Sequence, residues 1–211
     1  MTDFEPLVAE LAKDAAPVTP AAHPYVLSLK WMAAGAVYLA LALALSGLRP
    51  DWRHAFMQPW FAAEIGALTL VFVASSLSAA LLAFPDLHQK RALALLPLAA
   101  FVLFVLVIAR AWLADSPPAP PPVHSYQCTL SITLMALLPA TWTFYSMRRL
   151  ATTHRGWAGS VAVLSAFSVG ALWLRLHELN DSISHVVTWH YLPMLAAGAI
   201  GLWLGRRLLK W

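Results

Sequence analysis

Long apolar runs separated by short polar stretches dominate this chain. After a polar start over residues 1–25, six apolar runs follow, each close to the ~20 residues that a membrane-spanning helix needs. The runs cover residues 26–48, 60–84, 92–113, 129–147, 157–176 and 186–209. The pattern predicts an all-α integral membrane protein with a six-transmembrane-helix bundle at 26–211 and an N-terminal amphipathic segment at 1–25.

The composition supports the membrane assignment. The chain of 211 residues is 60% hydrophobic and only 11% charged, whereas soluble domains carry about 25% charged residues. Its net charge of +4 does not indicate nucleic-acid binding, because the basic residues lie beside the apolar runs rather than in one patch. The first residues are acidic and no small-residue cleavage site precedes the run that begins near Val26, so we expect that run to stay in the membrane.

Lysine and arginine predict the orientation. With the N-terminus inside, ten of the 14 basic residues fall on the inner side and four on the outer side. The outer four are Arg49, Arg53, Arg110 and Arg175. Because positive residues accumulate on the cytoplasmic side of a membrane protein, we expect both termini to be cytoplasmic.

The N-terminal segment has the pattern of a short amphipathic helix. Four apolar residues follow the spacing i, i+3, i+4, i+7: Phe4, Leu7, Val8 and Leu11. Prolines then end the helix and form an extended linker: Pro17, Pro20 and Pro24. Such a tethered helix could bind a partner, lie on the bilayer surface or be a disordered tail.

Two charged residues are expected to lie at similar outer depths on the second and third spans. Glu64 and Arg110 could form a buried ion pair there, which would leave neither charge alone in lipid. The alternative is that each side chain extends separately to the headgroups.

Histidines gather on the expected outer side, near one cysteine. They are His54, His124, His177, His185 and His190, with Cys128 and Met57 nearby. Imidazole and thiolate are ligands for copper or zinc, so a transition-metal site is one hypothesis, although the spacing matches no compact zinc motif. The alternatives are hydrogen bonding at the interface and a pH-responsive cap. We expect His185 to be the weakest candidate because it can face water.

Other function classes find little support in the sequence. The single cysteine excludes an internal disulfide. The histidines cluster at one end of the predicted bundle rather than facing each other inside it, which argues against haem. The chain has no motif typical of an enzyme, and no ionisable residue lies near the middle of a span, as it usually does in proton-coupled transporters.

An ordered series of short motifs nevertheless resembles a known family. The motifs are Pro17-Val18, Arg49-Pro50-Asp51, Pro59 through Glu64, His124-Ser125 with Cys128, Ala158-Gly159, His177 with Asp181-Ser182, Trp189-His190-Tyr191 and the end Leu208 to Trp211. Together they resemble the NrsF family of integral-membrane anti-sigma factors over nearly the whole chain.

The resemblance implies six membrane helices in a bacterial inner membrane. It also implies a cytoplasmic N-terminal segment that holds an extracytoplasmic-function sigma factor inactive and releases it when the outer side detects stress. In one departure from the family, Glu178 stands where a cysteine directly follows the histidine at the start of the last outer loop. This argues against a two-cysteine redox or soft-metal mechanism with Cys128 and leaves a histidine-rich outer face with one thiol.

Our hypothesis is therefore a non-enzymatic, membrane-bound anti-sigma factor. The apolar stripe would bury itself in the sigma factor, and acidic residues would meet its basic surface: Asp3, Glu5, Glu10 and Asp14. Candidate residues for sensing or metal binding are Glu64, His124, Cys128, His177 and His190. The alternative is a small six-helix transport component or substrate-binding subunit, with the outer loops as a gate.

Overall fold

The computed structural model describes residues 4–14, 21–85, 91–114 and 125–210, and within this part the chain is helical. The helices in order are α1 (Glu5–Asp14), α2 (Pro24–Ser46), α3 (Trp52–Met57), α4 (Pro59–Leu82), α5 (Arg91–Ala94), α6 (Leu96–Ala114), α7 (Tyr126–Met147), α8 (Arg155–His177), α9 (Ile183–Val186), the π-helix η2 (Val187–Tyr191) and α10 (Leu192–Leu208).

Six of the described helices are long and apolar enough to cross a membrane, which confirms the predicted number of spans. They are α2, α4, α6, α7, α8 and the continuous run Ile183–Leu208. The boundaries differ from the expected ones by a few residues. Prolines account for two of the differences, since Pro24 and Pro59 occupy first-turn positions where the missing N–H costs nothing.

The bundle is built around α4 and α8, whose side chains are mostly buried. Helices α2 and α6 pack on α4, and α7 and α10 pack on α8. The outward faces of α2, α6 and α7 stay apolar and exposed, as expected for helices that face lipid. The bundle therefore hides its few polar groups between helices and turns its hydrophobic surface outward.

Glycines allow α8 and α10 to approach closely. A Cβ atom added at Gly201 would lie 2.7 Å from the carbonyl oxygen of Gly159, and one at Gly205 would also meet the backbone of α8. Gly201 and Gly205 are four residues apart on one face of α10, the small-xxx-small arrangement that brings membrane helices together. This contact fixes α10 against the central helix of the bundle.

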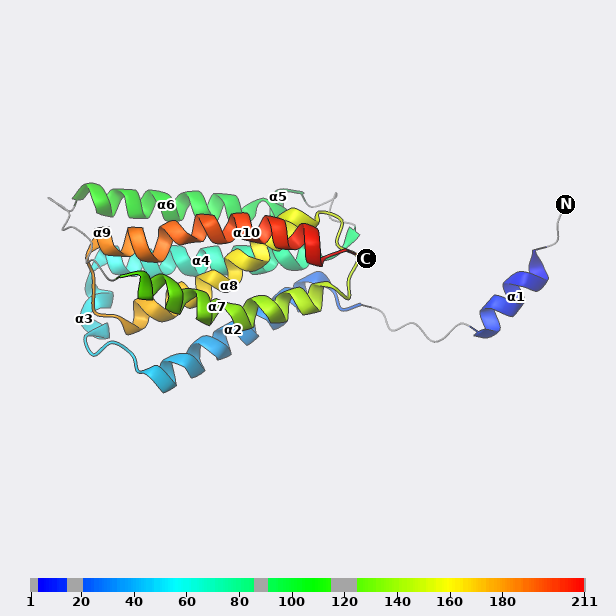
Figure 1. The fold of residues 1–211 in the computed structure, drawn as a ribbon, viewed down its shortest axis with the longest axis horizontal. Coiled ribbons are helices and arrows are strands. Elements are labelled where there is room, and N and C mark those ends of the chain that lie inside the picture. Colours follow the sequence, from blue (N-terminus) through cyan, green and yellow to red (C-terminus); the bar gives the residue numbers. More distant parts are fainter. Residues whose placement is uncertain (1–3, 15–20, 86–90, 115–124, 211) are drawn as a thin grey trace.

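The two ends of the bundle differ in what they carry. Both the start of α2 and the end of α10 lie at one end, here called the terminal end, and α1 lies apart from the bundle beyond it (Figure 1). The opposite end, here called the cap end, is formed by residues 47–58 and 178–182. The short helix α3 belongs to the cap end and was not predicted as a helix.

Candidate functional site

The first polar cluster at the cap end joins three helices and two loops of the bundle. This arginine cluster consists of Arg49, Asp51, Glu64, Arg175, Asp181 and Tyr191. Both arginines are buried, with 1% and 3% of the residue exposed. Such charges persist inside a protein only when they are paired, so their partners determine what the cluster does.

Arg175 of α8 makes a two-fold hydrogen bond to Glu64 of α4. Its Nε donates to Oε1 at 2.8 Å and its Nη2 donates to Oε2 at 2.9 Å. The hydroxyl of Tyr191 also donates to Glu64 Oε1. Arg175 Nη1 reaches Asp181 at 3.2 Å. The bidentate geometry is the strong form of a carboxylate–guanidinium contact, and it ties the two central helices together.

Arg49 completes the arginine cluster from the loop after α2. Its Nε donates to Asp51 at 2.8 Å and its Nη2 donates to Asp181 Oδ2 at 2.6 Å. The hydrogen bonds that Arg49 donates to Asp181 and then to Asp51 raise the pKa of its guanidinium. Burial by itself raises the pKa of Asp181, but the hydrogen bond from Arg49 and the charge of Arg175 outweigh it and hold that pKa below its usual range. Asp181 therefore stays ionised and bridges both arginines.

The Glu64–Arg110 ion pair suggested by the sequence is wrong. Arg110 is exposed on α6, whereas Glu64 is buried and bonded to Arg175. The expectation that Glu64 and Arg110 lie at similar depths in the membrane was not enough to identify the partner of Glu64. Glu64 lies on the side of α4 that packs against α8, and Arg175 on that helix reaches it.

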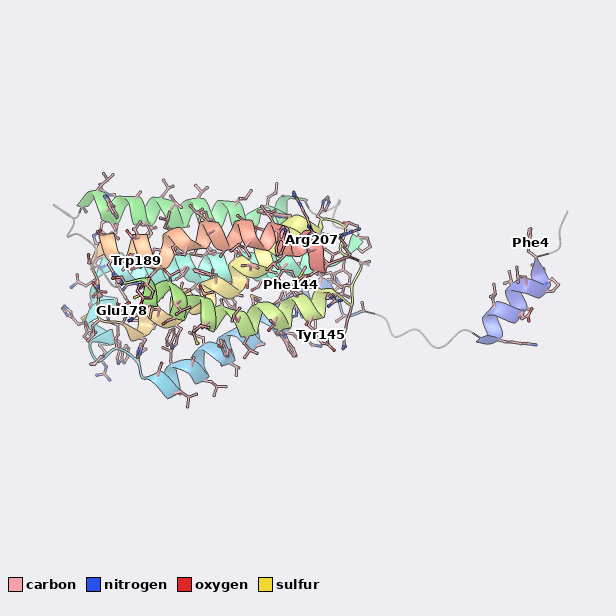
Figure 2. All side chains as sticks on the ribbon, viewed as in Figure 1. Phe4, Phe144, Tyr145, Glu178, Trp189 and Arg207 are labelled. Atoms are coloured by element: carbon pink, nitrogen blue, oxygen red, sulfur yellow. The ribbon has the colours of Figure 1, made fainter. Side chains whose placement is uncertain are left out.

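The second polar cluster lies beside the first. This histidine cluster consists of Cys128 from α7, Glu178 after α8, His185 from α9 and His190 from η2. Four potential ligand atoms, one from each residue, lie within 4.8 Å of one another. Glu178 and Trp189 lie together at the cap end in Figure 2, away from Phe144, Tyr145 and Arg207 near the other end.

The distances inside the histidine cluster are short. Cys128 Sγ lies 3.6 Å from His185 Nε2 and 3.8 Å from both Glu178 oxygens. His185 Nε2 lies 3.4 Å from Glu178 Oε1, and His190 Nε2 lies 3.1 Å from Glu178 Oε2. Burial raises the pKa of Glu178, but the contacts with His190 and His185 and the charge of Arg175 outweigh it and hold that pKa below its usual range.

Several polar atoms of the histidine cluster are buried without a hydrogen bond of normal geometry to a described residue. They are Nδ1 and Nε2 of His190 and Nδ1 of His185. His190 is fully buried and His185 is 2% exposed. Imidazole nitrogens lose their hydration when buried, so this arrangement costs free energy unless a bound group compensates.

A change in helix type brings the two histidines together. In an α-helix, residues five apart point about 140° away from each other. The π-helix η2, in which the N–H of Leu192 donates to the carbonyl of Val187, has more residues per turn. The rings of His185 and His190 consequently meet edge to face, with centroids 5.1 Å apart.

Pro193 explains why the helix changes type at this point. In a regular α-helix the carbonyl of Trp189 would accept the N–H of residue 193, which proline lacks. Instead, Thr129 Oγ1 donates to the Trp189 carbonyl at 2.6 Å. This bond joins α7 to η2 and places the neighbouring residue, Cys128, against the histidines.

The structure revises the set of candidate sensing residues. It brings Cys128 and His190 together as members of one cluster. It separates His177, which stacks on Trp173 and bonds the Gly47 carbonyl at 2.9 Å, and Glu64, which belongs to the arginine cluster. His124 lies outside the described residues.

Two members of the histidine cluster were missed or undervalued by the sequence. His185 was expected to face water but is buried beside Cys128, and the π-helix that follows it brings His190 to the same side. Glu178 was noted only as a departure from the family, although its carboxylate touches all three other members. The one sequence signal for this geometry is the proline three residues after His190.

The cap end also holds a cavity of about 320 Å³. Trp60, Phe61, Glu64 and Arg175 contribute to its walls. The two guanidinium groups of the arginine cluster each lie 5.0 Å from the centre of the Phe61 ring. The charged groups in the wall already bond one another, so the cavity offers a ligand mainly aromatic and aliphatic contacts.

At the other end of the molecule, α1 presents its apolar stripe to the surroundings. Four large apolar side chains, one directly before α1 and three within it, are 53–64% exposed: Phe4, Leu7, Val8 and Leu11. Glu5 lies in the first turn and Lys13 in the last, where each charge is favourable to the helix dipole. Asp3 and the side chain of Asp14 lie outside what the structure describes.

Comparisons with known proteins agree with the resemblance noted in the sequence. Residues 11–211 match the family NrsF, described as negative regulator of sigma F. The chain is 29% identical over 212 residues to the anti-sigma-F factor NrsF of Caulobacter vibrioides, and the match covers 97% of this chain and 98% of the relative. No solved structure matches it. Since the family match spans the whole bundle and begins within α1, this chain belongs to the NrsF family of negative regulators of sigma F.

Proposed function

We propose that this protein is an anti-sigma factor of the bacterial inner membrane that sequesters an extracytoplasmic-function sigma factor through α1. A periplasmic or membrane stress signal at the cap end releases the sigma factor. The terminal end of the bundle and both chain termini face the cytoplasm. Membership of the family and the name of the relative support the regulatory role.

The exposed stripe of α1 is the observation that carries this proposal. A helix of ten residues is marginal in water by itself, so its conformation and its apolar face both call for a partner surface. Burying each side chain of the stripe is worth about 1.5–3 kcal/mol before ordering costs. An amphipathic helix of this kind binds into an apolar groove through residues at i, i+3, i+4 and i+7.

Acidic residues flank the stripe and extend the proposed contact. At 100° per residue, Glu5 falls on one flank of the stripe and Glu10 on the other. Asp14 comes four residues after Glu10 in the sequence, and Asp3 precedes the helix. These carboxylates would meet basic residues of the sigma factor and favour rapid association of the two proteins.

The orientation rests on the distribution of basic residues. Arg148, Arg149, Arg206 and Arg207 lie in or beside the terminal turns of helices that end at the terminal end. The positive-inside tendency of membrane proteins favours the cytoplasm for this end. The cap end, with both polar clusters, would then face the periplasm.

A path for the signal leads from the cap end along two helices. The N–H of Arg49 donates to the carbonyl of Leu176, which ties the loop after α2 to α8. His185 and His190 of the histidine cluster lie at the start of the continuous helical run that ends with α10. A change at the cap end would shift α2 or α10 and alter how α1 is presented, provided that the bundle has two packing states.

Binding of the full-length protein, held in lipid nanodiscs, to its sigma factor tests the proposal. The probe is an extracytoplasmic-function sigma factor from the same organism, and its dissociation constant is measured by titration. The Leu7→Asp variant should bind at least tenfold more weakly, because burying an unpaired charge in an apolar groove is unfavourable. A tenfold change in the dissociation constant corresponds to about 1.4 kcal/mol of binding free energy.

The matched control is Ala9→Asp, which adds the same charge on the opposite face of α1. It should change the dissociation constant less than threefold. Equal binding by the wild type and Leu7→Asp would contradict the proposal, as would equal losses in the two variants.

A further inference from the structure

We propose that Cys128, Glu178, His185 and His190 form a binding site for one divalent transition-metal cation of the zinc class. The site goes beyond the proposed anti-sigma role and does not depend on it. It also differs from the metal site suggested by the sequence, because Glu178 was not among those candidates and His185 was the weakest of them.

The spacing of three of the four donor atoms is close to that of a tetrahedral zinc shell. With Zn–N, Zn–O and Zn–S bonds of ordinary length, tetrahedral geometry puts neighbouring ligand atoms about 3.4–3.6 Å apart. The observed separations are 3.4 Å between His185 and Glu178, 3.6 Å between Cys128 and His185, and 3.8 Å between Cys128 and Glu178. Small side-chain adjustments would complete the shell.

The buried nitrogens point to a ligand rather than to a hydrogen-bonded network. Nε2 of His190 lies 3.1 Å from Glu178 but without hydrogen-bond geometry, and the ring is fully buried. A cation at the centre of the cluster would accept the lone pair of this nitrogen. It would thereby compensate for the hydration that the imidazole lost on folding.

The charges of the donors also favour a divalent ion. Cys128 as thiolate and Glu178 as carboxylate carry two negative charges, and neutral His185 and His190 carry none. A divalent cation makes the complex neutral, which removes most of the cost of burying charge at the end of an apolar bundle. On binding, the thiol proton of Cys128 leaves to the solvent.

The donor set selects the kind of metal. Magnesium and calcium require oxygen ligands, six or more in number, and the cluster offers one carboxylate. Two imidazoles and a thiolate suit zinc and its neighbours among the transition metals. The side chain of Glu178 is 23% exposed, which provides an entrance for the ion from the cap end.

Metal titration of the full-length protein in nanodiscs, without sigma factor, tests the inference. The protein is first treated with a chelator, and Zn²⁺ is then added in competition with a chromophoric chelator. We expect one zinc ion per chain. Glu178→Gln keeps the size of the side chain but removes its charge, and Cys128→Ser removes the thiolate. Each should weaken zinc binding at least about 100-fold, since even second-shell changes cost 10–100-fold.

Co²⁺ supplies a direct spectroscopic test of the thiolate ligand. Wild-type protein should show a thiolate-to-cobalt charge-transfer band that Cys128→Ser lacks. His177→Ala, which removes a histidine of the same end but outside the cluster, should leave zinc affinity and the cobalt spectrum unchanged. Absence of stoichiometric zinc binding in the wild type, or equal binding in Glu178→Gln and wild type, would overturn the inference.

The experiment separates this inference from the proposed function. Zinc binding is read without a sigma factor, and sigma binding through α1 is read without added metal. A protein that binds zinc but no sigma factor would support the metal site alone, and the opposite result would overturn only the metal site.

Discussion

The arginine cluster and the histidine cluster lie side by side at the cap end, and both are largely buried, yet they differ in how their polar atoms are paired. Buried Arg49 and Arg175 each bond two carboxylates in good geometry. In the histidine cluster, three buried ring nitrogens lack a hydrogen bond of normal geometry to a described residue.

This difference suggests two distinct roles. The arginine cluster already satisfies its charges and so acts as a structural lock between α4, α8 and the loops of the cap end. The histidine cluster has the donor atoms in place but not their partners, which is the condition expected of a preformed binding site. Three changes test this contrast, beginning with the one that should have the largest effect.

Breaking the lock should destabilise the protein strongly. Arg175→Met leaves Glu64 buried without its cation, and removal of one partner of a buried pair typically costs about 3–5 kcal/mol. The free energy of unfolding can be measured in mixed micelles with increasing SDS. Arg110→Met is the matched control, since Arg110 is exposed and its replacement should change stability by less than about 0.5 kcal/mol. Similar losses in the two variants would mean that Arg175 is not part of a lock.

Removing a histidine should have a small effect of the opposite sign. In metal-free protein, His190→Leu keeps a similar volume and eliminates two buried ring nitrogens that lack hydrogen bonds. We expect the free energy of unfolding to stay the same or to rise by about 1 kcal/mol, because an unsatisfied buried group costs about 1–3 kcal/mol. A loss above about 2 kcal/mol would show that His190 makes a stabilising hydrogen bond without metal.

Acid should weaken the lock gradually. Burial raises the pKa of Asp181, but Arg49 and Arg175 outweigh it and hold that pKa below its usual range in the folded protein. The hydrogen bond from Arg49 also lowers the pKa of Asp51. A lowered pKa stabilises the fold at pH values above the unfolded pKa of about 3.9, and this contribution is lost as the pH falls through the folded pKa.

Unfolding measured from pH 5 downward should therefore show a loss of stability that begins near pH 4 in the wild type. Asp181→Asn should be less stable at pH 5 and show a shallower dependence on pH below 4. The effect is the smallest of the three because Asp181 is about half exposed and solvent screens its charge. An identical pH dependence in the two proteins would assign the acid sensitivity to other carboxylates.

The sequence by itself determined the architecture: six apolar runs of membrane-spanning length, and a helical stripe with Leu7 and Leu11 before them. These features are local, because every backbone polar group in a membrane must be satisfied within its own helix. Hydropathy and helical spacing therefore suffice to place such elements, and the order of short motifs sufficed to indicate the family.

Only the tertiary structure decided which polar residues meet. Glu64 pairs with Arg175, 111 residues away, because α4 and α8 pack at the centre of the bundle. His185 and His190 converge because Pro193 leaves a carbonyl that Thr129 of α7 bonds, and the helix widens into a π-turn there. Helical periodicity alone would have turned these two histidines apart, so the site depends on a local break in the pattern and on packing between distant helices.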